Sequence, residues 1–167
     1  MSKQSNSKRV IRIYWEHIKP YKKKLWIIYP SMVVAQVVED FIQPLIISYI
    51  LTSLASGNLD QLRNNNLPLI LIALAFTEAF GHLMWNKFII PVFWRSQDMI
   101  MRDLNMTAFN HLQLMSARFF GDRFAGSLVS QVNKFVGSYE RLTDAMTWNV
   151  FKLLVSLVVT TVILFPK

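Results

Sequence analysis

Long apolar runs alternate with polar segments along this chain. Three blocks, at residues 25–56, 67–94 and 147–165, are each rich enough in apolar residues to form a helix across a bilayer. The hydrocarbon core is about 30 Å thick, and a helix crosses it with about 20 apolar residues. A soluble domain would instead disperse its apolar residues at helix or strand spacing. The pattern therefore predicts an all-α membrane protein with three long transmembrane helices.

The polar stretch between the second and third blocks, residues 95–146, carries two apolar stripes at helical spacing. The first stripe is Met101, Leu104, Ala108, Leu112 and Met115, and the second is Leu128, Val132, Phe135, Tyr139, Leu142 and Met146. Between Leu67 and Met115 only Gly81, Pro68 and Pro91 weaken a helix, so one helix of about 70 Å could run from the membrane into this stretch. The stripes predict a helical hairpin outside the membrane, whose second helix continues into the third block at about Thr147.

Residues 1–24 precede the first block and form a basic N-terminus. Within residues 8–21, apolar residues recur at helical spacing against a basic face, and these are Val10, Ile13, Tyr14, Ile18 and Tyr21. This pattern predicts a helix that lies flat at the membrane interface, which we call the elbow helix. Pro20 should end or bend it, because proline has no N–H to donate. A solvated basic tail is the alternative for residues 1–9.

The net charge of +8 is concentrated beside the membrane. Eight basic residues precede the first block, opposed only by Glu16, and they are Lys3, Lys8, Arg9, Arg12, Lys19, Lys22, Lys23 and Lys24. The loop between the first two blocks carries Arg63 alone. By the positive-inside rule, we expect a protein of the cell membrane with a cytoplasmic N-terminus, a cytoplasmic hairpin and an outer C-terminal end. A cleaved signal peptide is excluded, because its apolar region of about 7–15 residues would be far shorter and would not contain Glu39 and Asp40.

Five ionisable residues fall inside the first two blocks: Glu39, Asp40, Glu78, His82 and Lys87. Each costs roughly 2.5–3.5 kcal/mol at the membrane centre, so each needs a partner or water. Counting from the outer loop places Asp40 level with His82, and Lys87 within reach of Glu39, which predicts paired charges between two antiparallel helices. Alternatively, the residues line a water-filled translocation cavity that contacts a cationic substrate or protons. Glu78 has no depth-matched partner and favours the cavity.

Other chemistry finds little support in the sequence. The chain has no cysteine, and His17, His82 and His111 are too scattered for a metal site. No GxxxxGK[ST] phosphate-binding loop is present, so we expect no enzyme activity and no bound cofactor in the chain itself. Basic and aromatic residues are interleaved only in the membrane-proximal elbow, which argues against a nucleic-acid partner.

The turn of the predicted hairpin contains an aromatic pair, Phe119 and Phe120, near Asp122 and Arg123. These rings need burial, either in a local core with Phe124 or against a partner protein. The motif continues with Gly126 and then Leu128-Val129-Ser130. With the topology, it resembles the transmembrane domain of type IV ABC exporters, and the resemblance covers essentially the whole chain.

The resemblance implies a coupling helix at the hairpin turn, which would contact a nucleotide-binding domain. Its residues would be Ser116, Ala117, Arg118, Phe119, Phe120, Gly121, Asp122 and Arg123. Gly126 would relieve crowding where the chain enters the next helix. The chain departs from the family pattern at Gln131 and Phe135, where the family usually has arginine and aspartate, four residues apart on one helix face.

A larger departure is length, because family members have six crossings and this sequence has three. The resemblance therefore implies a fragment, the N-terminal half of a transmembrane domain. ATP and magnesium would bind a nucleotide-binding domain that this sequence lacks. The other expected partners are membrane lipid and a second transporter subunit, identical or different.

The expected function is to form part of the substrate pathway of an ATP-driven exporter. The alternative is a standalone three-helix membrane scaffold or regulatory subunit, which would fold and be expressed as it stands. The sequence does not identify the substrate, because lipid, peptide and drug exporters share this architecture.

Overall fold

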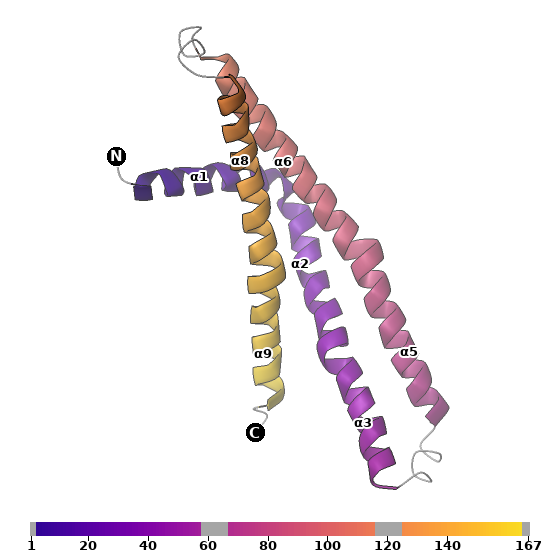
Figure 1. Ribbon diagram of the computed structural model, residues 1–167. Helices are drawn as coiled ribbons and strands as arrows, with labels where there is room; N and C mark the ends of the chain where they lie inside the picture. Colours follow the sequence, from indigo (N-terminus) through magenta and orange to yellow (C-terminus); the bar gives the residue numbers. More distant parts are fainter. Residues whose placement is uncertain (1–2, 58–66, 116–124, 165–167) are drawn as a thin grey trace. The chain divides into compact units, whose positions relative to one another are not determined.

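The structure is a computed structural model that describes residues 3–57, 67–115 and 125–164 (Figure 1). Every element among these residues is helical, which confirms the all-α prediction. In chain order the elements are α1 (Lys3–Ile18), η1 (Lys19–Tyr21), α2 (Lys22–Val37), η2 (Val38–Ile42), α3 (Gln43–Ala55), α5 (Leu67–Leu83), η3 (Met84–Ile89), α6 (Ile90–Gln113), α8 (Ala125–Asp144), η4 (Ala145–Phe151) and α9 (Lys152–Leu164).

Three helices of the described chain are long and apolar enough to cross a membrane, and they run Ser7–Ala55, Leu67–Gln113 and Gly126–Ile163. They contain nearly all of the three apolar blocks of the sequence, and together they indicate a membrane protein. The second and third extend well beyond their apolar blocks into the polar stretch, as α6 and α8. This confirms the prediction that the hairpin helices are continuous with helices long and apolar enough to cross a membrane.

Each of the three long helices changes to a π-helical segment along its length. In η2 the N–H of Gln43 bonds the carbonyl of Val38, five residues back, directly before Pro44. The same arrangement precedes Pro91 at the end of η3. Proline has no N–H and clashes with the carbonyl four residues back, and a wider turn accommodates both effects. No proline lies in η4, and nothing in the sequence explains that segment.

The chain divides into two compact units, which we describe separately. The hairpin unit comprises residues 1–26 and 93–150, and thus α1, η1, the start of α2, most of α6, α8 and most of η4. The span unit comprises residues 27–92 and 151–167, and thus most of α2, η2, α3, α5, η3 and α9.

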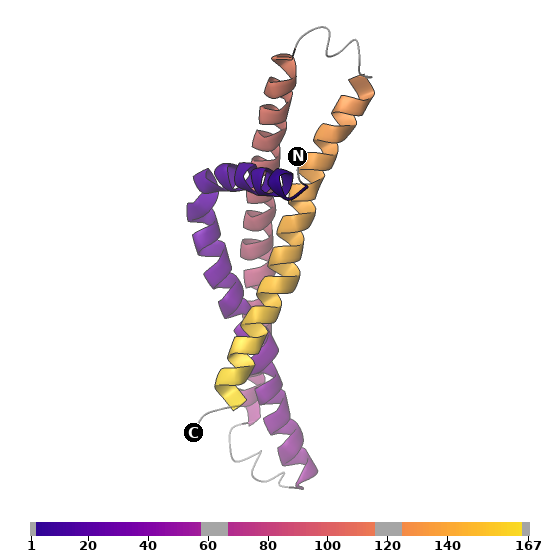
Figure 2. The same ribbon diagram turned by 90° about the vertical axis from the view of Figure 1, so that its left-hand side faces the viewer.

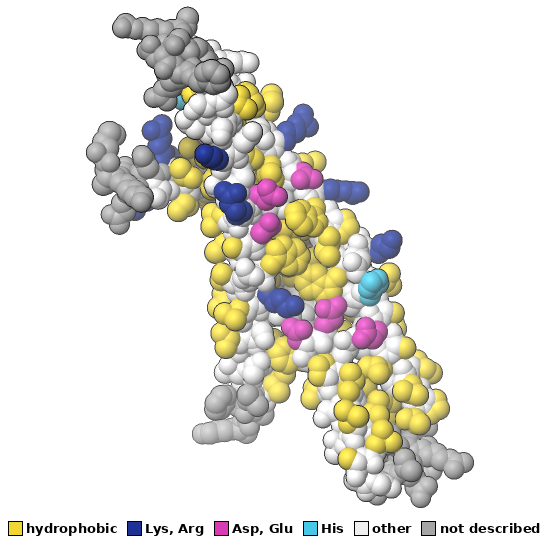
Figure 3. Space-filling view, in the orientation of Figure 1, with side chains coloured by type: hydrophobic (Ala, Val, Ile, Leu, Met, Phe, Trp, Pro, Cys, Tyr) yellow, Lys and Arg dark blue, Asp and Glu magenta, His cyan; other side chains and the backbone are white. Residues whose placement is uncertain are grey.

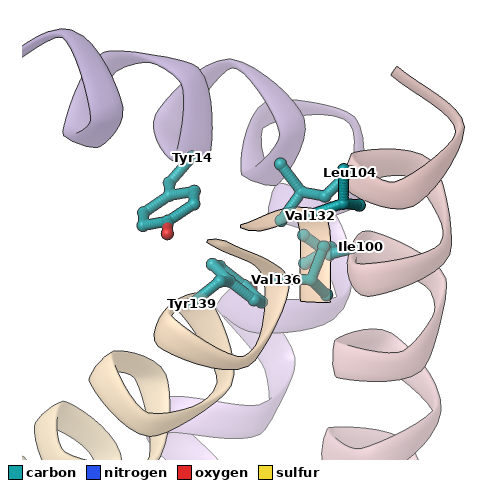
Figure 4. Packing of buried hydrophobic residues seen from close by; sticks show 6 residues of the cluster. All are labelled: Tyr14, Ile100, Leu104, Val132, Val136 and Tyr139. Carbon is teal, nitrogen blue, oxygen red and sulfur yellow. The ribbon is translucent and has the colours of Figure 1, made fainter. Parts of the chain in front are cut away.

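The core of the hairpin unit joins α1 to both hairpin helices (Figure 4). Its buried members are Tyr14 from α1, Ile100 and Leu104 from α6, and Val132, Val136 and Tyr139 from α8. In this unit α1 runs crosswise to α8 (Figure 2). The apolar stripe of α1 is therefore used to pack against the hairpin, and the two hairpin stripes share this third helix as their partner.

Three polar contacts attach α1 and η1 to the hairpin. The hydroxyl of Tyr14 donates to the carbonyl of Phe135 at 2.7 Å, and its ring lies 5.1 Å from the Phe135 ring. The hydroxyl of Tyr21 donates to the carboxylate of Asp103 at 2.7 Å. A third contact, of 2.9 Å, joins the His17 ring to the Thr107 hydroxyl. The elbow segment is thus held at both α6 and α8.

The structure corrects the predicted start of the first helix. The first helix begins at Lys3 rather than at residue 8, and residues 7–9 are exposed. Pro20 lies in the 3-10 turn η1 and bends the chain there, as predicted.

The second hairpin stripe ends earlier than predicted. Leu142 and Met146 are 46% and 54% exposed, whereas Val136, outside the predicted stripe, is buried. The physical reason is that the core shared with α1 takes residues of α8 only as far as Tyr139.

Candidate intramembrane polar site

Ionisable side chains from three helices meet in the span unit. Glu39 and Asp40 lie in η2, Glu78 lies in α5, and Lys152 begins α9. Figure 3 shows acidic and basic side chains gathered on one face among apolar ones. We call the set formed by Glu39, Asp40, Glu78 and Lys152 the carboxylate cluster.

Glu39 lies directly against Gly81 of α5. A Cβ added at Gly81 would be 2.9 Å from Oε1 of Glu39 and 3.0 Å from its Cγ, both shorter than ordinary contact distances. Gly81 is buried, and the absence of its side chain lets η2 and α5 approach closely. The position of the Glu39 carboxylate is therefore set by a glycine on the neighbouring helix.

Charge around Glu39 is unbalanced. The carboxylates of Asp40 and Glu78 and the ammonium of Lys152 each interact electrostatically with Glu39. Glu39 is half-buried, while the other three are exposed on the surface of this chain. Around Glu39, two further carboxylates and one ammonium group leave an excess of negative charge. Chemically, the cluster can bind a cationic group or carry protons.

The ion pairs predicted between the first two spans do not form. Among the described residues, the structure contains no ion pair between Asp40 and His82 or between Glu39 and Lys87. The His82 ring instead contacts the side-chain amide of Asn86 on its own helix at 3.2 Å. Equal depth along two helices was insufficient, because the side chains must also lie on facing sides of both helices. All five predicted residues lie in the span unit, but of these only Glu39, Asp40 and Glu78 belong to the cluster.

Lys152 was missed by the sequence analysis. It lies inside the third apolar block, where it is the only basic residue between positions 147 and 165. That exception was the available signal. Gln36, a polar residue inside the first apolar block, was also missed. It is buried in α2, and its amide donates to the carbonyl of Lys152 at 3.0 Å. This bond joins the first and third spans beside the cluster.

The described residues contain no group of three or more His, Asp or Glu side chains placed to hold a metal ion. His17 and His111 lie in the hairpin unit and His82 lies in the span unit.

The predicted coupling helix, residues 116–123, lies outside the described residues. Gly126 lies in the first turn of α8, and its position is exposed. Of the two departures from the family pattern, Gln131 is exposed. Phe135 instead packs against Tyr14, so this position contributes to the core of the hairpin unit.

No protein-family model, no curated protein and no solved structure matches this chain.

Proposed function

We propose that this chain forms part of the transmembrane domain of an ATP-driven exporter of the ABC type. The observation that carries the proposal is the carboxylate cluster, in which Asp40, Glu78 and Lys152 are exposed on membrane-spanning helices. Exposure of such groups to lipid would cost roughly 2.5–3.5 kcal/mol each near the membrane centre. They must therefore face water or further protein, which is expected of a chain that lines a polar pathway with other helices.

The cluster also suggests the kind of substrate group that passes. An excess of carboxylates over ammonium groups attracts positive charge, and the surrounding helices are apolar. A cation with an apolar body matches both properties. Protonation of one carboxylate is the alternative way to relieve the repulsion.

The hairpin helices would connect this pathway to ATP. Both extend from their spans into the polar stretch, and α1 braces them through Tyr14. In the proposal, residues 116–123 contact a nucleotide-binding domain, with Phe119 and Phe120 as the apolar contact. Closure of two such domains on ATP would move the hairpin and change the access of the cluster. The π segments before Pro44 and Pro91 are suited to bending, because their hydrogen-bond ladders are already altered.

Site-specific cross-linking tests the proposal. Because the chain has no cysteine, Asp122→Cys gives a single thiol at the predicted hairpin turn. In native membranes, a thiol-reactive cross-linker should join it to a polypeptide or domain that is also photolabelled by azido-ATP. Asn58→Cys, in the predicted outer loop, is the matched control and should give no ATP-labelled product.

The same two variants also define the result that would refute the proposal. A folded Asp122→Cys chain that gives no ATP-labelled product, under conditions in which the thiol is accessible to a small maleimide, would refute the coupling to ATP. The standalone scaffold would then be the better description.

A further inference from the structure

A basic surface surrounds the junction between α1 and α2, and the proposed function does not use it. Lys19, Lys22 and Lys23 are exposed in consecutive turns of η1 and α2. None of the three forms an ion pair in the described part of the chain. Nearby acidic groups are already engaged, since Glu16 pairs with Arg12 at 3.1 Å and Asp103 accepts from Tyr21. Among the described residues, this lysine surface therefore has no ion-pair partner.

Large apolar side chains lie exposed beside the lysines. Ile11 and Trp15, four residues apart on α1, are each 60% exposed, and Trp26 at the start of α2 is 78% exposed. Tryptophan concentrates at membrane interfaces, where its apolar ring and polar N–H both find suitable surroundings. Exposed indoles suit the boundary between acyl chains and headgroups, and the lysines beside them suit the phosphate layer of the headgroups.

Distances along α6 place α1 at the depth of the headgroups. The second apolar block ends at Trp94, and α1 packs on α6 at Ile100 and Leu104, six and ten residues farther along. At 1.5 Å per residue, these positions lie about 9 and 15 Å beyond the end of the block. Headgroups extend about 5–7 Å beyond each side of the hydrocarbon core, and a helix is about 10 Å wide. The side of α1 nearer the membrane therefore reaches the headgroup layer.

We propose that Lys19, Lys22 and Lys23 form a binding surface for the phosphate-containing headgroups of anionic phospholipids, with Trp15 and Trp26 inserted beside them. Lys24 has a different role. Its ammonium group contacts the Met99 sulfur at 3.4 Å and lies 5.9 Å from the centre of the Tyr21 ring, so it helps to hold the junction. The bound lipids supply the negative charge that these lysines do not find among the residues of the structure described above.

Lipid-selective quenching of tryptophan fluorescence tests this surface. The full chain is reconstituted in nanodiscs that contain a fixed fraction of either phosphatidylglycerol or phosphatidylcholine brominated high in the acyl chains. Stronger quenching by the brominated phosphatidylglycerol measures a preference for anionic lipid near the indoles. We expect the preference to fall by up to roughly fivefold for each lysine replaced, because a basic residue near an anionic surface contributes about 1 kcal/mol.

The decisive variants carry equal changes in charge. K19Q/K22Q/K23Q should abolish the preference, whereas R102Q/K134Q/R141Q, which removes three exposed basic groups elsewhere in the hairpin unit, should retain it. Equal quenching of the natural chain by the two lipids would overturn the proposal, as would equal loss in both triple variants. Abolition of the preference by short duplex DNA at physiological salt would assign the surface to nucleic acid and would also overturn it. Each result is independent of whether the chain couples to ATP.

Discussion

Substitution of Tyr14 tests whether α1 is fixed to the hairpin. Its side chain is 5% exposed, its hydroxyl donates to the Phe135 carbonyl, and its ring lies 5.3 Å from the ring of Tyr139. Tyr14→Phe removes only the hydrogen bond and should lower the free energy of detaching α1 from the hairpin by about 1 kcal/mol. Tyr14→Ala also removes the buried ring, and the loss of an aromatic side chain from a core costs about 3–5 kcal/mol.

Hydrogen exchange of the α1 amides measures these changes locally. If α1 exchanges by detaching from the hairpin, a change of 1.4 kcal/mol corresponds to about a tenfold change in exchange rate. We therefore expect exchange about fivefold faster in Tyr14→Phe and more than about a hundredfold faster in Tyr14→Ala, measured by mass spectrometry in nanodiscs.

Arg9→Ala is the control, because Arg9 is exposed on the same helix and alanine preserves helix propensity. Its α1 exchange should match that of the natural chain. The reasoning is refuted if Tyr14→Ala, with unchanged helix content by circular dichroism, exchanges α1 no faster than Arg9→Ala does. Such a result would mean that α1 is not held by the core of the hairpin unit.

Three further predictions concern helix packing and the carboxylate cluster. Gly137→Ala should stabilise the protein by about 0.5–1 kcal/mol, because alanine has the higher helix propensity and its Cβ would lie at an ordinary contact distance of 3.6 Å from the Arg141 side chain. Gly81→Ala should lose that gain, because Glu39 would have to shift. Thermal unfolding in detergent compares the two, and greater stabilisation by Gly81→Ala would contradict the close contact. Glu39→Gln and Lys152→Met should be non-additive by about 0.5–3 kcal/mol in a double-mutant cycle, and strictly additive unfolding free energies would mean that the two charges do not interact. Gln36→Leu should lower the free energy of unfolding by about 0.6–1 kcal/mol, because the hydrogen bond to the Lys152 carbonyl is lost. An unchanged midpoint of unfolding in detergent would argue that this bond does not contribute to stability.

The helices themselves were predictable because their causes are local. Three apolar blocks are long enough to span a bilayer, and the sparse glycine and proline between residues 67 and 115 allow one continuous helix. The stripe residues Leu104 and Val132 were correctly placed in a core, because helical periodicity reports which side of a helix is apolar. The ionisable residues Glu39, Asp40 and Glu78 were also visible in the sequence, as exceptions within apolar blocks.

The partners of these faces were decided only by the tertiary structure. Tyr14 contacts Phe135 across 121 positions of sequence, and Glu39 interacts with Lys152 rather than with Lys87. Periodicity and depth fix where a side chain lies on its own helix, but they do not fix how neighbouring helices are rotated and spaced. Close packing sets that choice, as when the missing side chain of Gly81 admits Glu39. The sequence by itself thus determined three spanning helices with charges inside them, and packing between distant segments determined which charges and which aromatic rings meet.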